Sequence, residues 1–138
     1  MSILGINHIT IAVKNLETSF NFYQNILGFR PLMRSSRNAY FLAGDLWFCL
    51  DQDPTTRTQA LPEYTHFAFS VSQDNFSSTT KKITDSGAKV WKENKSEGES
   101  LYFLDPDNHK LEIHVGNWES RVDSAKKNPW EVGIEFFQ

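Results

Sequence analysis

A pattern of alternating residues occurs twice in this chain, and it limits the fold more than any other feature. Residues 7–13 read NHITIAV and residues 65–71 read THFAFSV, so that aligning them places His66 over His8. The shorter segments AYFL (39–42) and LYFL (101–104) match in the same way and place Tyr40 over Tyr102. Apolar residues at every second position are typical of strands with one buried face. A repeat of this kind predicts two copies of one structural unit packed together.

Each copy predicts a βαβββ unit. After the first strand, Asn15 is a helix N-cap, and Gly28 ends the first helix; Ser72 and Gly87 take these places in the second copy. Three short strands follow each helix, at about 29–34, 39–42 and 46–50 in the first copy and 88–91, 100–104 and 110–115 in the second.

We therefore expect a single α+β domain over residues 1–138, with the helices outside a cupped mixed sheet. Its parts are module one (about 3–51), a linker, module two (about 64–116) and a helical tail (about 117–138). In the tail we expect a buried stripe of Trp118, Val122 and Ala125, and a short strand at 133–137. The faces turned away from the helices form the predicted hollow, lined by His8, Thr10, Tyr40, Trp47, His66, Ser100, Tyr102, Glu112 and His114.

Composition excludes several classes of partner. A net charge of −3 without a long basic run argues against nucleic acid. No apolar run approaches the roughly 20 residues needed to span a bilayer, so we expect no membrane partner. The one cysteine, Cys49, rules out an internal disulfide, fits the cytoplasm, and is expected to be a small unreactive residue inside the cup.

His8, His66 and Glu112 form the candidate metal site. Two imidazoles and a carboxylate suit a divalent transition metal. The first-module counterpart of Glu112 falls near Phe48, which cannot ligate, so open coordination positions would remain, as in catalytic sites. In the competing interpretation, the histidines are hydrogen-bonded core residues and Glu112 pairs with Lys110 or Arg121. His114 is a rival ligand or a support for the ligands, and His109 is structural.

A cationic and oxygen-rich cluster follows in the second module. Lys92, Lys95 and Arg121 stand out in an acidic chain and, beside Ser96 and Ser100, could bind a phosphate-like group. An oxygen-rich loop able to hold a monovalent cation is formed by Asn94, Ser96, Glu97, Gly98 and Ser100. The alternative interpretation is an ordinary polar hairpin loop with solvated charges.

Five segments together resemble the glutathione-dependent fosfomycin resistance proteins of the vicinal oxygen chelate superfamily. They are INHITIAV, SFNFYQNILGF, AYFLAGDLWFCL, YTHFAFSV and WKENKSEGESLYFLDPDNHKLEIHVG. The resemblance covers about residues 3–125, and its most specific part is WKENKSEGES. It implies a homodimer with the vicinal oxygen chelate fold, Mn²⁺ as the metal and K⁺ as an activator.

The resemblance also implies roles for individual residues. It makes His8, His66 and Glu112 the metal ligands, with His8 supplied by the other chain of the dimer, and it assigns Tyr40 to generating the thiolate. The implied fosfomycin-binding residues are Thr10, also implied in catalysis, and Trp47, Tyr64, Lys92, Ser96, Ser100, Tyr102 and Arg121. The implied potassium loop is Asn94, Ser96, Glu97, Gly98, Ser100 and Tyr102.

The predicted reaction adds glutathione across the epoxide of fosfomycin. The chain departs from the family pattern around the expected thiol channel, at Ser35, Arg37, Asp51 and Lys95, so the antibiotic site is better supported than the thiol. Two other classes stay open. One is a binding protein that sequesters the drug without chemistry. The other is a different metalloenzyme of this fold, an Fe(II) dioxygenase or a glyoxalase-like enzyme, acting on a small anionic substrate.

Overall fold

The first half of the chain folds as the predicted βαβββ unit, in a computed structural model that describes residues 2–137. Asn15 caps the helix, since its Oδ1 accepts a hydrogen bond of 3.0 Å from the Thr18 amide. The strands form one mixed sheet in the order β1-β4-β3-β2. The elements are β1 (His8–Val13), α1 (Leu16–Asn21), the π-helical turn η1 (Phe22–Ile26), β2 (Arg30–Arg34), β3 (Asn38–Ala43) and β4 (Leu46–Gln52).

The second half repeats this arrangement, which confirms the predicted duplication. Ser72 caps its helix by accepting a hydrogen bond of 3.3 Å from the Asn75 amide. Its sheet has the order β5-β8-β7-β6, the same order as the first. The elements are β5 (Phe67–Ser70), α2 (Gln73–Asp85), β6 (Val90–Lys92), β7 (Ser100–Leu104) and β8 (Lys110–His114).

Strand register corrects one prediction about the repeat. In the second sheet Glu112 lies beside Ala68 and Tyr102. The residue in the same position of the first sheet is Cys49, which lies beside Thr10 and Tyr40. The counterpart of Glu112 is therefore Cys49 and not its neighbour Phe48, whose fully buried ring belongs to the core. A one-residue shift along a strand moves a side chain to the opposite face of the sheet.

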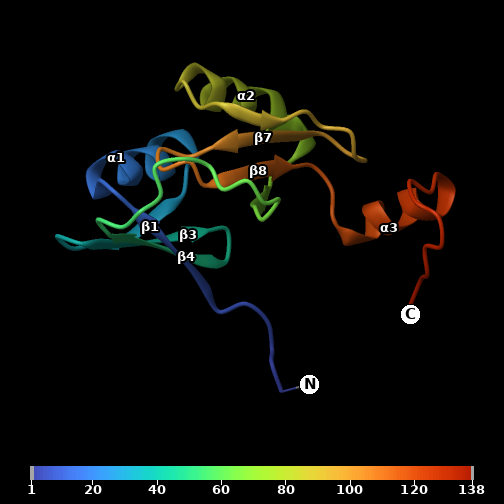
Figure 1. Cartoon of the computed structure of the whole chain (residues 1–138), viewed down its shortest axis with the longest axis horizontal. Helices are drawn as coiled ribbons and strands as arrows, with labels where there is room; N and C mark the ends of the chain where they lie inside the picture. The colour runs from blue at the N-terminus through green and yellow to red at the C-terminus, as the bar shows by residue number, and fades with distance from the viewer. Residues whose placement is uncertain (1, 138) are drawn as a thin grey trace.

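An aromatic core joins the two modules. Phe22 packs on Phe103 with ring centroids 6.4 Å apart, and Phe69 lies 5.1 Å from Phe29 and 5.9 Å from Phe48. Figure 1 shows the two sheets as separate layers, with α1 at one end of the first and α2 above the second. The apolar residues of both sheets form one core, and the alternate, polar residues of each sheet lie on its opposite face. Each module therefore has its own polar face.

A buried polar turn also links the modules. The Tyr23 hydroxyl donates to Asp105 at 2.6 Å, and His109 Nε2 donates to the Ala12 carbonyl oxygen at 2.7 Å. Burial raises the pKa of both the Tyr23 hydroxyl and the Asp105 carboxyl. His109 therefore has the structural role expected of it, holding the end of β1 against the start of β8.

The tail forms the third helix, α3 (Trp118–Lys127), capped by Asn117. Ala125 is buried, but Trp118 is 73% exposed, so the predicted buried stripe is wrong at Trp118. The predicted strand at 133–137 is also wrong, because these residues have no strand pairing. Both predictions assumed a neighbouring surface, and in Figure 1 α3 projects away from the two sheets. No helix within residues 2–137 is both long and apolar enough to cross a bilayer.

Candidate metal and anion site

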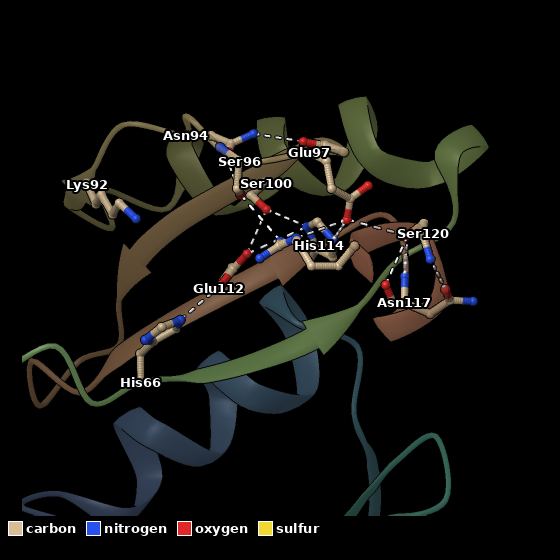
Figure 2. A network of polar contacts seen from close by, with 12 residues as sticks. His66, Lys92, Asn94, Ser96, Glu97, Ser100, Glu112, His114, Asn117 and Ser120 are labelled. Carbon is tan, nitrogen blue, oxygen red and sulfur yellow. Dashed lines mark hydrogen bonds and ion pairs between the residues drawn. The ribbon is translucent and has the colours of Figure 1, made fainter. Parts of the chain in front are cut away.

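His66 and Glu112 face each other on the polar side of the second sheet (Figure 2). His66 Nδ1 lies 2.8 Å from the Tyr64 carbonyl oxygen, which can only accept, so Nδ1 carries the proton. In the neutral ring Nε2 then holds a lone pair, and it lies 3.0 Å from Glu112 Oε1. Two acceptors this close need a cation or a second proton between them. Glu112 is only 5% exposed, which makes an uncompensated charge there costly.

The other oxygen of Glu112 begins a chain of polar contacts. The Ser100 hydroxyl donates to Glu112 Oε2 at 2.6 Å. Ser100 Oγ also lies 2.6 Å from His114 Nδ1, and because its one proton goes to Glu112, Nδ1–H donates to it. His114 Nε2 then lies 3.5 Å from Glu97 Oε1. The carboxylate of Glu112 is thereby oriented from behind, as is usual for metal ligands.

The loop between β6 and β7 is folded around the side chain of Asn94. Asn94 Oδ1 accepts from the Ser96 amide at 3.1 Å and from the Ser96 hydroxyl at 3.0 Å, and Nδ2 donates to the Gly98 carbonyl oxygen at 2.9 Å. Arg121, predicted to hold the substrate anion, donates through Nε to Glu97 Oε1 at 3.2 Å. Its charge therefore compensates the loop carboxylate in this structure.

Lys92 supplies a cation on the same face as Glu112, since it pairs with Tyr102 across the sheet. Its ammonium lies 4.6 Å from the Tyr64 ring centroid and 4.8 Å from that of Tyr102, and it donates to the Tyr64 hydroxyl. The hydrogen bond to Tyr64 raises the pKa of Lys92, so the ammonium form persists at neutral and mildly alkaline pH. Two aromatic faces and one hydroxyl fix the direction of this charge. Lys95, by contrast, is exposed in the loop.

Sequence reasoning missed Trp91 as a part of this face. Its ring lies 5.4 Å from His66 and 5.2 Å from Tyr102, and its Nε1 donates to the Leu111 carbonyl oxygen at 3.0 Å. Simple alternation would place Trp91 opposite Lys92. A register shift between Val90 and Lys92 allows both to face the site.

The polar face of the first sheet carries the remaining predicted residues. His8 and Thr10 are exposed. The His8 ring packs at 4.5 Å on Trp47, and its Nδ1 lies 2.8 Å from Asn7 Oδ1. Tyr40 packs at 5.3 Å on the same Trp47. The described part of the chain offers no hydrogen-bond partner to the buried Nε1 of Trp47.

One chain brings together His66 and Glu112 but does not complete a metal cluster. Within residues 2–137, no group of three or more His, Cys, Asp or Glu side chains could hold a metal ion. His8 belongs to the other sheet, so the nine side chains expected to line one hollow divide between two faces. The donor set nevertheless fits a divalent metal, since an imidazole nitrogen and a carboxylate oxygen converge on one point. The neutral oxygens and the Glu97 carboxylate of the Asn94–Ser100 loop fit a monovalent cation.

Comparisons with known proteins identify the family. Residues 5–113 match the Glyoxalase/Bleomycin resistance protein/Dioxygenase superfamily. The chain is 41% identical to the glutathione transferase FosA of Serratia marcescens, over 96% of this chain and 94% of that protein. It is 33% identical to the metallothiol transferase FosB of Lysinibacillus sphaericus, over 99% of each.

A solved structure shows the same fold. A variant of the fosfomycin resistance protein FosX from Listeria monocytogenes, complexed with Mn(II) and 1S,2S-dihydroxypropylphosphonic acid, superposes with a TM-score of 0.76. It is 31% identical, and the match covers 87% of this chain and 98% of that one. The chain therefore belongs to the Glyoxalase/Bleomycin resistance protein/Dioxygenase superfamily and, within it, to the group of fosfomycin resistance proteins that includes FosA, FosB and FosX.

Proposed function

We propose that the protein is a metal-dependent thiol transferase that opens the epoxide of fosfomycin by adding glutathione. The observation that carries this proposal is the pairing of His66 Nε2 with Glu112 Oε1 at 3.0 Å, with Nδ1 of the same ring committed to the Tyr64 carbonyl oxygen. This arrangement presents two metal donors and leaves other coordination positions for a substrate.

A divalent metal such as Mn²⁺, bound by His66, Glu112 and His8, supplies Lewis-acid assistance to opening of the epoxide, worth several kcal/mol. A pure sequestering protein needs no such donor pair, which favours catalysis over binding alone. The Lys92 ammonium, on the same face, favours a phosphonate over the neutral or carbonyl substrates of other metalloenzymes with this fold.

The proposed third ligand, His8, comes from a second copy of the chain. In one chain the His8 face and the His66 face belong to different sheets, and His8 is exposed. A two-fold dimer that places the first sheet of one subunit against the second sheet of its partner satisfies both copies of the site at once.

The substrate side chains have distinct tasks in this proposal. Lys92 holds the phosphonate and so fixes the epoxide in position for in-line attack. Ser96 and Tyr102 complete the anion pocket, and Thr10, on the His8 face, orients the oxirane oxygen. Tyr40, on the same face as Thr10, donates a hydrogen bond to the sulfur of the incoming thiol, which loses its proton to solvent and attacks as the thiolate.

The Asn94–Ser100 loop holds K⁺ in this proposal. A monovalent cation there adds positive charge next to the bound phosphonate. Glu97 already has Arg121 as a partner at 3.2 Å, so the charge of a bound cation is not cancelled by this carboxylate and acts on the phosphonate. Arg121 then acts on the substrate through the loop as well as through its own charge.

Product analysis tests the proposal. The protein is incubated with Mn²⁺, K⁺, fosfomycin and, in parallel, glutathione, cysteine, bacillithiol or no thiol, and the products are identified by mass. The expected product is the glutathione adduct, formed fastest of the four. A diol in every tube would assign the protein to hydrolysis, and unchanged drug that co-elutes with the protein would support sequestration.

A further inference from the structure

His114 is a titratable side chain of the second face to which the proposed reaction gives no task. Its Nδ1 lies 2.6 Å from Ser100 Oγ, and Ser100 in turn donates to Glu112 Oε2 at 2.6 Å. Its Nε2 lies 3.5 Å from Glu97 Oε1 on the opposite side of the ring. The imidazole is 14% exposed, so it lies between the metal ligand and the cation loop and not in solvent.

Two glycines hold the ring in this position. A Cβ added at Gly98 would lie 2.9 Å from His114 Cε1, and one added at Gly116 would lie 2.8 Å from Nε2. Both distances are shorter than real Cβ contacts allow, so a side chain at either position would displace the ring. Both glycines also have positive φ, +74° and +137°, which other residues rarely adopt. The local backbone is therefore built around this imidazole.

The contacts beyond His114 lead into the oxygen-rich loop without a break. Glu97 Oε1 accepts from Arg121 Nε at 3.2 Å, and Arg121 Nη2 lies 3.4 Å from Ser96 Oγ. Ser96 donates to Asn94 Oδ1 at 3.0 Å. Figure 2 shows this run of contacts from Glu112 to Asn94, with the imidazole of His114 at its centre.

We propose that His114 is a positioning residue that links occupancy of the Asn94–Ser100 loop by a monovalent cation to the affinity of the His66–Glu112 pair for divalent metal. The inference rests on the proposed function, since it takes both cation sites from it. A cation bound by the loop oxygens reduces the motion of the loop. The contacts of the His114 imidazole then restrict Ser100 and Glu112 as well. The divalent metal then binds to ligands that are already ordered, so its binding loses less conformational entropy and the two cations bind with positive cooperativity.

Metal titration of the intact, metal-free protein tests this link without any turnover. The Kd for Mn²⁺ is measured from the electron paramagnetic resonance of free Mn²⁺, in potassium chloride and in tetramethylammonium chloride at equal ionic strength. We expect potassium to lower this Kd by about fivefold or more, the lower end of typical coupling between sites. By reciprocity, Mn²⁺ should raise the affinity for potassium by the same factor.

Three variants assign the link to the imidazole. His114→Phe keeps a planar ring but removes both nitrogen contacts, and Ser100→Ala removes the next contact toward Glu112. Both variants should still bind Mn²⁺, but the ratio of the Kd in tetramethylammonium chloride to the Kd in potassium chloride should be about 1, the value for uncoupled sites. Gln73→Ala is the matched control, because Gln73 donates at 2.6 Å to Glu99, a loop residue outside the run of contacts, and it should keep the wild-type ratio.

The possible failures are distinguishable. If the wild-type protein binds Mn²⁺ equally well in both salts, the link is wrong and the metal site stands. If His114→Phe and Ser100→Ala both retain the wild-type ratio, the cations are coupled by another route and the role given to His114 is wrong. Absence of saturable Mn²⁺ binding in the wild-type protein would overturn the metal site itself.

Discussion

The two modules share a fold but present very different faces. On the second sheet, Glu112, Ser100 and His114 form a continuous run of hydrogen bonds with distances of 2.6 Å. On the first sheet, the corresponding face is aromatic, and His8 packs at 4.5 Å on Trp47 with one polar contact to Asn7. The second face therefore carries a continuous polar network, whereas the first carries an exposed imidazole packed against an aromatic ring.

The position of Glu112 shows how this difference arises. Its first-module counterpart, Cys49, lies beside Thr10 and Tyr40 in the same register, yet it carries no charge. A carboxylate at both positions would give a closed set of four donors when the faces meet. Because only the thiolate binds metal and burial raises the pKa of the Cys49 thiol, the protonated thiol leaves that position open for a substrate. The asymmetry of the repeat, rather than the fold, is what makes the candidate site suitable for catalysis.

The largest expected effect comes from neutralising Glu112, the acidic residue of the Glu112 and Cys49 pair. Glu112→Gln keeps the shape of the side chain but removes the charge that faces His66 Nε2 at 3.0 Å. We expect affinity for Mn²⁺ and turnover of fosfomycin to fall by at least about 10-fold, as for other changes around metal ligands. Metal titration and steady-state rates measure the two losses. Unchanged metal affinity would remove Glu112 from the ligand set.

Glycine substitutions compare the cation loop with a plain hairpin turn. At Gly98 (φ +74°) an added Cβ would lie 2.3 Å from the Val115 carbonyl oxygen, whereas at Gly44 (φ +61°) it meets nothing within 4 Å. Gly98→Ala should cost about 3 kcal/mol or more, from backbone strain and a clash together. Gly44→Ala should cost about 1 kcal/mol, from backbone strain alone.

Urea unfolding measures both free energies of unfolding, and the difference between the two variants is the informative quantity. Equal losses would mean that Gly98 is needed only for its backbone angle. The close packing of the loop against Val115 and His114 would then have no energetic role.

The smallest effect is expected at Cys49, the neutral member of the comparison. The thiol is 4% exposed, and Cys49→Ala should cost about 1 kcal/mol, as for loss of a methylene-sized group. Turnover should change little, because the reaction needs no protein nucleophile. A large loss of turnover with intact metal binding would instead give Cys49 a direct role.

Labelling gives an independent check on Cys49. Burial raises the pKa of its thiol, so at pH 8 less thiolate is present in the folded chain than in the unfolded one. A thiol reagent should therefore react more slowly with the native protein than with the protein in urea. The native rate should rise with pH as the thiolate fraction increases.

Much of this architecture could be predicted from the sequence because caps and alternation are local. Asn15 and Ser72 mark both helix starts, and the alternation of 7–13 and 65–71 gives the two sheet faces. Register could not be predicted as well. Cys49 lies 41 positions after His8 (49 − 8), and Glu112 lies 46 after His66 (112 − 66), so loops of unequal length displaced the inferred counterpart by one residue.

The sequence indicated candidate residues for the site but not the contacts between them. It could not show that Arg121 pairs with Glu97, because that contact depends on how the first turn of α3 lies beside the loop. Trp91 escaped notice because a register shift in β6 turned it onto the site face. Trp118 was predicted to be buried because helical spacing identifies an apolar stripe without saying what lies opposite it.

Subunit mixing tests most directly whether the two unlike faces combine across a dimer. His8→Ala and Glu112→Gln proteins should each be inactive as homodimers. After co-refolding in equal amounts, the mixed dimers contain one intact site, built from His8 of one subunit with His66 and Glu112 of the other. Random pairing then predicts recovery of about a quarter of the wild-type activity. Activity that stays at the level of the separate variants would contradict a site shared between chains.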